Sequence, residues 1–340
     1  MSIKEILKGK ALTWVFVLIV LSFVPIFAGR YIVVLGNNIL IYAIIIVGFN
    51  LIFGYVGQCS FAANAFFGIG AYVAAGLTTR FYDFPFIVGM ISATVATGLV
   101  GYLIGFPCLK VKGFYLAMVT LAFAEICSIL FVQLRGLTGG ADGYSGLPSA
   151  SIAGYSFDTP VSFYYFILVL FIICAVAAQN LIDSKIGRAM RSMQVSELGA
   201  IAAGVKIAKY KTMAFAIHAA YAGLAGACFV HYSHFVSPEL FNLMMAIEVL
   251  VMSMVGGVTS IGGALIGAAV LRIVPELGIL PYQWYFVIYG LIIMLVMIFL
   301  PKGLLPGILE VIRYRRNPLR LPEQFRLVRR FSPITEPKGR

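Results

Sequence analysis

Charged side chains are scarce in this chain of 340 residues. They make up 11% of the sequence, whereas 61% of the residues are hydrophobic and the mean hydropathy is +0.99. A water-soluble globule of this size would need many more polar residues to cover its surface. The composition therefore excludes a soluble fold, and with it disorder, collagen and a coiled coil. Much of the exterior must face lipid.

Paired cysteines and the common catalytic signatures are also missing. The five cysteines stand singly with no CxxC pair, which excludes a disulfide framework and a zinc knuckle. There is no GxxxxGK[ST] phosphate loop, no GxSxG, no HExxH and no pair of carboxylates in one short segment. We therefore expect no catalytic, cofactor-binding or metal-binding residues, and no ATP hydrolysis by this chain alone.

One group of residues superficially resembles a metal site. Cys228, His231 and His234 follow one another at steps of three, and each such step turns a helix by roughly 300°. The three side chains would spread around a wide arc, which does not suit a tetrahedral metal ion. We interpret the histidines as hydrogen-bonding residues at the membrane interface.

Long apolar runs are what the sequence does contain. A helix needs about 20 apolar residues to cross the hydrocarbon layer, and runs near that length recur between charged or Gly/Pro-containing breaks. We predict an all-α polytopic membrane protein with about ten transmembrane helices. The predicted spans are 11–28, 31–53, 61–79, 84–107, 114–134, 161–182, 212–230, 245–258, 260–274 and 285–300.

Three of these runs, 61–79, 245–258 and 260–274, are short or rich in glycine and alanine. Each is a candidate for a broken or re-entrant helix buried behind its neighbours. Small residues at spacings of four, such as Gly101 with Gly105, predict close helix contacts. A weak likeness between the residues around Gly57 and those around Gly257 indicates either an internal repeat or ordinary packing seams.

Basic residues outnumber acidic ones by 25 to 13, and their placement indicates orientation. From Lys302 onward there are ten basic and three acidic residues. Segment 183–211 has six basic and two acidic residues, whereas the loop 135–160 has one basic and two acidic residues. The positive-inside rule then places both termini in the cytoplasm. We divide the chain into a transmembrane domain, 1–305, and a basic tail, 306–340, which favours a lipid surface over nucleic acid.

The cytoplasmic segment 183–211 is the most informative stretch. Residues 184–204 combine helix-forming residues with an apolar component at Met190, Met193 and Ile201 and a stop at Gly204. This predicts a short helix parallel to the membrane. It could lie on lipid, or it could dock in a groove on a cytoplasmic partner.

Three long motifs resemble a known family. They are GQCSFAANAFFGIGAY at 57–72, KGFYLAMVTLAFAEI at 112–126 and LTGGADGYSGLP at 137–148. In this order they are similar to the permease subunits of branched-chain amino acid ABC importers, of the LivM type, and the resemblance extends over roughly 38–305. The chain has Ala63 where that family often has histidine, and Gln194 and Val195 where it often has Arg-Glu.

The resemblance implies an assembly in the bacterial inner membrane. A homologous second permease, two cytoplasmic ATPases that bind ATP and Mg, and an extracytoplasmic substrate-binding protein would be the partners. Segment 183–211 would then hold the helix that couples the permease to the ATPases. The coupling residues expected on this basis are Arg188, Arg191, Glu197, Ala200 and Gly204.

A small group of polar residues within the spans could line a pathway for solute. The candidates are Gln58, Ser60, Asn64, Thr120 and Glu125, and the alternative for each is hydrogen bonding between helices. The resemblance and the near absence of ionisable residues favour branched-chain or other small apolar amino acids. Urea or a short amide is the alternative solute, and an ion-coupled carrier or a channel is the alternative mechanism.

Overall fold

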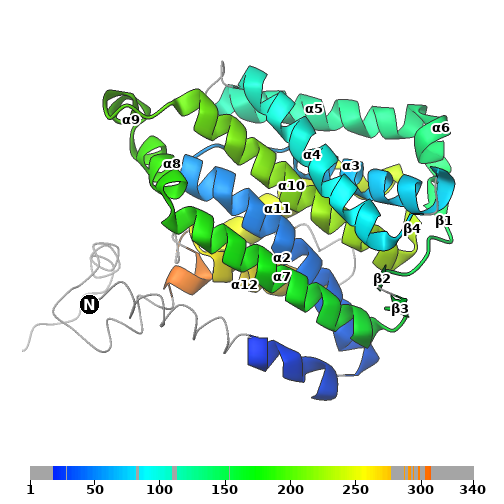
Figure 1. Cartoon of the computed structure of the whole chain (residues 1–340). Coiled ribbons are helices and arrows are strands. Elements are labelled where there is room, and N and C mark those ends of the chain that lie inside the picture. The colour runs from blue at the N-terminus through cyan, green and yellow to red at the C-terminus, as the bar shows by residue number, and fades with distance from the viewer. Residues whose placement is uncertain are drawn as a thin grey trace, which may run out of the picture.

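The computed structural model describes residues 18–27, 29–81, 84–108, 113–152, 154–276 and 303–307, with single residues between 287 and 298. Helices run side by side between an end that carries α8 and α9 and an end that carries short strands (Figure 1). The predicted span 285–300 and the tail 306–340 fall almost wholly outside the described residues, as does the start of span 11–28, which is helical over Leu18–Phe27.

Five described helices are long and apolar enough to cross a membrane. Their order and length follow from the apolar runs, with charged or Gly/Pro-containing breaks between them. Together with one bent pair they give at most six spans in the described part of the chain. The helices are α2 (Arg30–Val56), α4 (Phe86–Cys108), α5 (Phe114–Gln133), α7 (Pro160–Asp183) and α10 (Ile207–Ser233).

The bent pair is formed by α11 (Leu243–Gly256) and α12 (Ile261–Glu276), which turn by 119° at the break between them. Gly257 supplies a φ of +111° there, a conformation that glycine adopts without steric cost. The ion pair between Glu248 and Arg272, at 3.1 Å, holds the two helices together. The runs 245–258 and 260–274, predicted as separate spans and as candidates for broken or re-entrant helices, are therefore two short helices joined at a sharp bend.

The predicted run 61–79 is also shorter than a full span. Helix α3 (Ala63–Ala75) is followed by a π-helical stretch, η1 (Gly76–Phe81), and is buried almost all round. A Cβ at Gly70 would collide with the backbone of Gly223 in α10, and one at Gly101 would collide with Ala219. The small residues therefore set the close approach of α3 and α4 to α10, as their spacing predicted.

The two ends of the helix bundle differ. One carries α8 (Lys185–Val195) and α9 (Glu197–Ala202). The other carries two antiparallel strand pairs and short helical turns. These elements are β1 (Tyr144–Ser145) with β4 (Phe235–Val236), β2 (Ser151–Ile152) with β3 (Tyr155–Ser156), α6 (Arg135–Thr138), η2 (Gly140–Asp142) and η3 (Pro238–Phe241).

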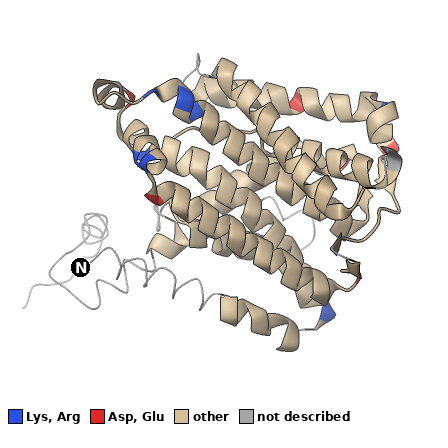
Figure 2. Ribbon diagram, viewed as in Figure 1, with Lys and Arg blue, Asp and Glu red and all other residues tan. Residues whose placement is uncertain are grey.

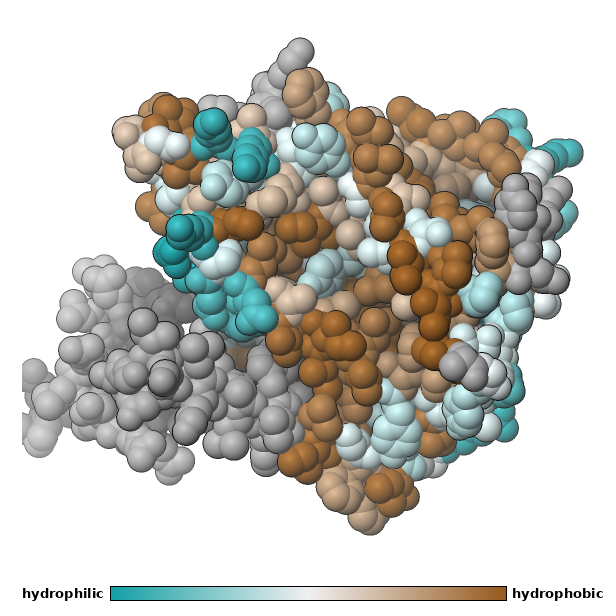
Figure 3. Space-filling view, viewed as in Figure 1, coloured by the Kyte–Doolittle hydropathy of each residue, from teal (hydrophilic) through white to brown (hydrophobic). Residues whose placement is uncertain are grey.

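Polarity follows this division. Charged residues lie mostly at the two ends of the helices (Figure 2), and hydrophobic side chains extend across the face between them (Figure 3).

The prediction of one helix over 184–204 is wrong, because Ser196 is extended, with φ −160°, and separates α8 from α9. Span 212–230 is longer than predicted, since α10 already begins at Ile207.

Candidate functional site

A six-residue non-helical segment, 57–62, connects the end of α2 to the start of α3. It begins where Gly57, with φ +75°, ends α2. The backbone N–H of Phe61 donates to Thr120 Oγ1 of α5 at 3.0 Å, and that of Ala62 donates to Ser60 Oγ at 3.3 Å. Non-helical backbone inside a membrane protein is tolerated where protein or a wet cavity satisfies it. Such breaks are where transporters bind solutes.

The structure brings four of the five predicted pathway residues to this segment. Gln58, Ser60, Asn64 and Thr120 are all buried. Asn64 Nδ2 donates to the carbonyl of Phe241 at 3.0 Å. Gln58 Oε1 and Asn64 Oδ1 accept no hydrogen bond from the described protein atoms. Buried acceptors of this kind are suited to a solute or to water.

The hydroxyl of Thr120 already has hydrogen-bond partners within the protein. It accepts a hydrogen bond from the backbone N–H of Phe61, and it lies within hydrogen-bonding distance of the carbonyls of Leu116 and Ala117, at 3.1 and 3.0 Å. Thr120 therefore links α5 to the non-helical segment 57–62.

Glu125 does not join the other four. It lies on the exposed side of α5, turned away from the buried side that carries Thr120. Within the described part of the chain its carboxyl group makes no hydrogen bond or ion pair. The Glu125 carboxyl group is therefore not hydrogen-bonded to a neighbouring helix within the described part of the chain.

Helix α8 packs against the end of α2, next to segment 57–62. The Ser184 hydroxyl caps α8 by accepting hydrogen bonds from two backbone N–H groups. Met190 and Met193 are buried beneath the helix. The Arg191 guanidinium lies over the ring of Tyr55, 5.2 Å from its centroid, and the Gln194 side chain lies against Gly57. Arg188 is exposed and donates to the carbonyl of Asp183 at 3.3 Å.

Helix α9 is tied to the start of α10. Glu197 Oε1 accepts from Lys211 Nζ at 2.5 Å, and Lys211 is only 2% exposed. A buried ammonium group needs such a partner. Ala200 is buried, and Gly204 follows α9 with φ +78° and open space around its Cα.

Exposed apolar side chains lie at the end of α8 and on the outward face of α9. We call Val195, Leu198 and Ile201 the α9 knob; their exposed fractions are 86%, 79% and 57%. The sequence predicted Met190, Met193 and Ile201 as the apolar component, but both methionines face the protein's own helices. Sequence reasoning missed Val195 and Leu198, because the break at Ser196 sets the direction in which α9 points.

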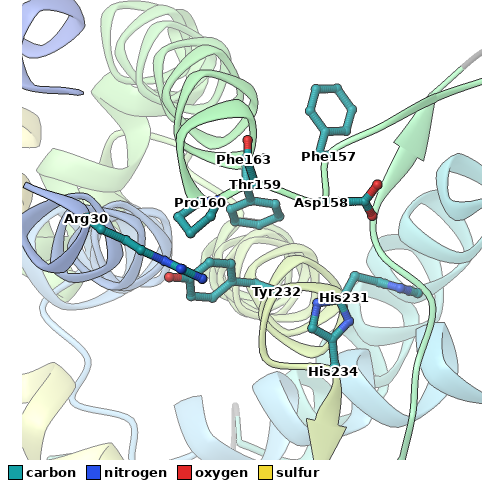
Figure 4. Close-up of a pocket in the computed structure, with 9 residues that line it drawn as sticks. All are labelled: Arg30, Phe157, Asp158, Thr159, Pro160, Phe163, His231, Tyr232 and His234. Carbon is teal, nitrogen blue, oxygen red and sulfur yellow. The ribbon is translucent and has the colours of Figure 1, made fainter. Parts of the chain in front are cut away.

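A pocket lies at the opposite end of the bundle, among the start of α2, the start of α7 and the end of α10 (Figure 4). His231 and His234 use Nδ1 to contact the carbonyls of Pro148 and Leu147, at 2.9 and 2.8 Å, and so fasten the loop above them. Hydrogen bonds from Ser149 and Ser156 lower the pKa of Asp158. Sequence reasoning missed this pocket, whose lining comes from segments distant in the chain.

The described residues contain no group of three His, Cys, Asp or Glu side chains placed to hold a metal ion. Cys228 is fully buried, and the two histidines bind separate carbonyls.

Comparison with known proteins identifies the family. A family profile described as branched-chain amino acid transport system / permease component matches residues 31–300. The high-affinity branched-chain amino acid transport system permease protein LivM of Salmonella typhimurium is 30% identical over 305 residues, which cover 83% of this chain and 72% of that protein.

A second kind of permease is also similar to this chain. The protein LivH of the corresponding Escherichia coli K12 system is 26% identical over 290 residues, covering 80% of this chain and 92% of LivH. The probable LivM of Methanocaldococcus jannaschii is 23% identical over 319 residues, covering 78% and 90%. No solved structure gave a significant match. The chain belongs to the family of branched-chain amino acid transport permease components and is a multi-pass membrane permease.

Proposed function

We propose that the chain is one permease subunit of an ATP-driven ABC importer for branched-chain or other small apolar amino acids. The family and the functions of the similar proteins support the transport role. The sequence has no phosphate loop, so ATP and Mg would be bound by two cytoplasmic ATPase subunits. The observation that carries the proposal is the α9 knob beside α8, which itself contacts the end of α2.

The α9 knob is the docking element for an ATPase. Val195, the last residue of α8, and Leu198 of α9 project from short helices outside the spans, where water would otherwise surround them. Burying a leucine or valine side chain in a partner's groove contributes about 1.5–3 kcal/mol. An apolar helix face in a hydrophobic groove is a common way for proteins to bind.

A path of direct contacts leads from the docking element to the pathway residues. Helix α8 touches Tyr55 and Gly57, and Gly57 begins the segment that carries Gln58 and Ser60. The ion pair between Glu197 and Lys211 links α9 to α10. A displacement of α8 and α9 by the ATPases would shift both connections together. Helices α8 and α9 would thus have two arrangements, one displaced and one not. Alternating access follows if ATP binding favours one of these two arrangements over the other.

The assembly has a defined orientation in this proposal. The end with α8 and α9 faces the cytoplasm, as both chain termini are proposed to do, and the strand-bearing end receives solute from an extracytoplasmic binding protein. The membrane is the bacterial inner membrane. We propose ten membrane-inserted helices. They are the five long helices, the shorter helices α3, α11 and α12, and the predicted spans at 11–28 and 285–300.

The proposed substrate is a zwitterion with an apolar side chain. Gln58 Oε1 and Asn64 Oδ1 can accept hydrogen bonds from its ammonium group, and no fixed charge is needed in the buried segment. Urea or a short amide could use the same acceptors. Competition against labelled leucine uptake by the whole complex separates them: valine and isoleucine should inhibit strongly, and strong inhibition by urea or short amides instead would overturn the amino-acid assignment.

A further inference from the structure

Helix α5 combines wide exposure with a carboxyl group. Of the five long helices, α4 and α5 are the least buried, with 22% and 28% of their apolar windows inside the protein. A subset of the exposed positions on α5 follows alternating steps of three and four, and we call this subset the α5 face. The α5 face consists of Tyr115, Met118, Ala122, Glu125, Ile129 and Val132.

Glu125 lies near the middle of the membrane. It is the twelfth residue of the 20 in α5, and at 1.5 Å per residue it lies roughly 17 Å from the start of a helix that crosses about 30 Å of hydrocarbon. An acidic residue facing lipid at that depth costs about 2.5–3.5 kcal/mol. The α5 face is therefore expected to be covered by something other than lipid.

The other exposed helix faces differ in this respect. Apart from Asn180 and Asp183 at the end of α7, the exposed residues of α4 and α7 are apolar or tyrosine, as a lipid-facing surface requires. The large ones on α4 are Val88, Ile91, Val95, Leu99, Tyr102, Leu103 and Phe106, and on α7 they are Val161, Tyr165, Val169, Ile173 and Val176.

We propose that the α5 face packs against the second permease subunit, which supplies a hydrogen-bond donor to Glu125. This inference rests on the proposed function. The other proposed partners, the ATPases and the binding protein, lie outside the bilayer and cannot reach the middle of a span. The 3-4 spacing of the α5 face suits packing against another helix, and Ala122 beside Glu125 permits close approach.

The geometry gives this interface a role in transport. Thr120 lies on the opposite side of α5 and binds the backbone of Phe61 in segment 57–62. One helix therefore separates the buried pathway residues from the second permease. A movement between the two permeases would act on segment 57–62 through α5.

Photocrosslinking in the complete complex tests the interface. A benzophenone amino acid replaces Ile129 on the α5 face or, as a matched control, Ile173 on α7; both isoleucines are 59% exposed. Irradiation should join the position-129 variant to the second permease, identified by its peptides, at least fivefold more than the position-173 variant. Equal yields, or no such adduct from position 129, would overturn the interface.

The contribution of Glu125 is tested by substitution. Glu125→Gln keeps a hydrogen-bonding group, whereas Glu125→Leu removes it. At equal expression, the leucine variant should co-purify several-fold less second permease than the glutamine variant, and equal recovery would contradict the donor contact. ATP-driven uptake by the unsubstituted complex is measured in parallel. Uptake that requires the ATPases without crosslinking at position 129 refutes only the interface, whereas uptake without the ATPases refutes the proposed function.

Discussion

Arg191 of α8 lies over the ring of Tyr55 of α2, with the guanidinium carbon 5.2 Å from the ring centroid. Tyr55 is two residues before Gly57, where α2 ends and segment 57–62 begins. The hydroxyl of Tyr55 also donates to the carbonyl of Thr259 at 2.6 Å, in the break between α11 and α12. One residue thus connects α8 to both helix breaks.

Arg191→Ala is expected to weaken coupling without preventing assembly. A cation–π contact at an exposed site contributes about 0.5–1 kcal/mol, so substrate-stimulated ATP hydrolysis should fall about two- to fivefold. The measurement is ATPase activity of the reconstituted complex with and without substrate. Arg188→Ala is the control, because Arg188 contacts only a nearby backbone carbonyl in the described structure. Equal losses in the two variants would argue against transmission through Tyr55.

Leu198→Glu should release the ATPases. The leucine is exposed on the α9 knob, so the isolated permease should keep its stability while the affinity for the ATPase falls at least about tenfold. Co-purification in mild detergent measures the loss. Leu240→Glu, in η3 at the opposite end, should leave ATPase binding unchanged. If Leu198→Glu binds ATPase normally, the α9 knob is not the docking element.

Gly204→Trp should stop transport while leaving the permease folded. The backbone at Gly204 has φ +78°, which costs a non-glycine residue about 1–2 kcal/mol, but no atoms lie within 4 Å of the position of a Cβ. A bulky side chain there would obstruct the approach of the ATPase. Gly204→Asn is the control, since asparagine tolerates this conformation and is small. Uptake in vesicles at matched expression should persist for Asn and be lost for Trp; normal uptake by the Trp variant would place Gly204 outside the contact.

Glu197→Gln should lower thermal stability. The change leaves the buried ammonium of Lys211 without its carboxylate, which we expect to reduce the free energy of unfolding by about 1–3 kcal/mol. Thermal unfolding in detergent should show a lower midpoint than for Glu239→Gln, a substitution at an exposed residue of η3. Adding Lys211→Met to Glu197→Gln should recover most of the loss. A midpoint unchanged by Glu197→Gln would show that the ion pair is not stabilising.

The apolar runs sufficed to predict the long helices, because hydrocarbon thickness fixes helix length. Gly57 and Gly257 end helices with positive φ at the two helix breaks, where the sequence indicated only an internal repeat or ordinary packing seams. Other features depend on tertiary packing. The inward direction of Met190, the outward direction of Glu125 and the assembly of the pocket around Arg30 are set by how helices pack, which no single segment encodes.

The most direct test is leucine uptake by proteoliposomes that contain both permeases, with and without the two ATPases, supplied with binding protein and ATP. We predict uptake against a concentration gradient only when ATPases and hydrolysable ATP are both present on the cytoplasmic side, and no uptake driven by an ion gradient alone. Undiminished uptake by the permeases without the ATPases would contradict the account.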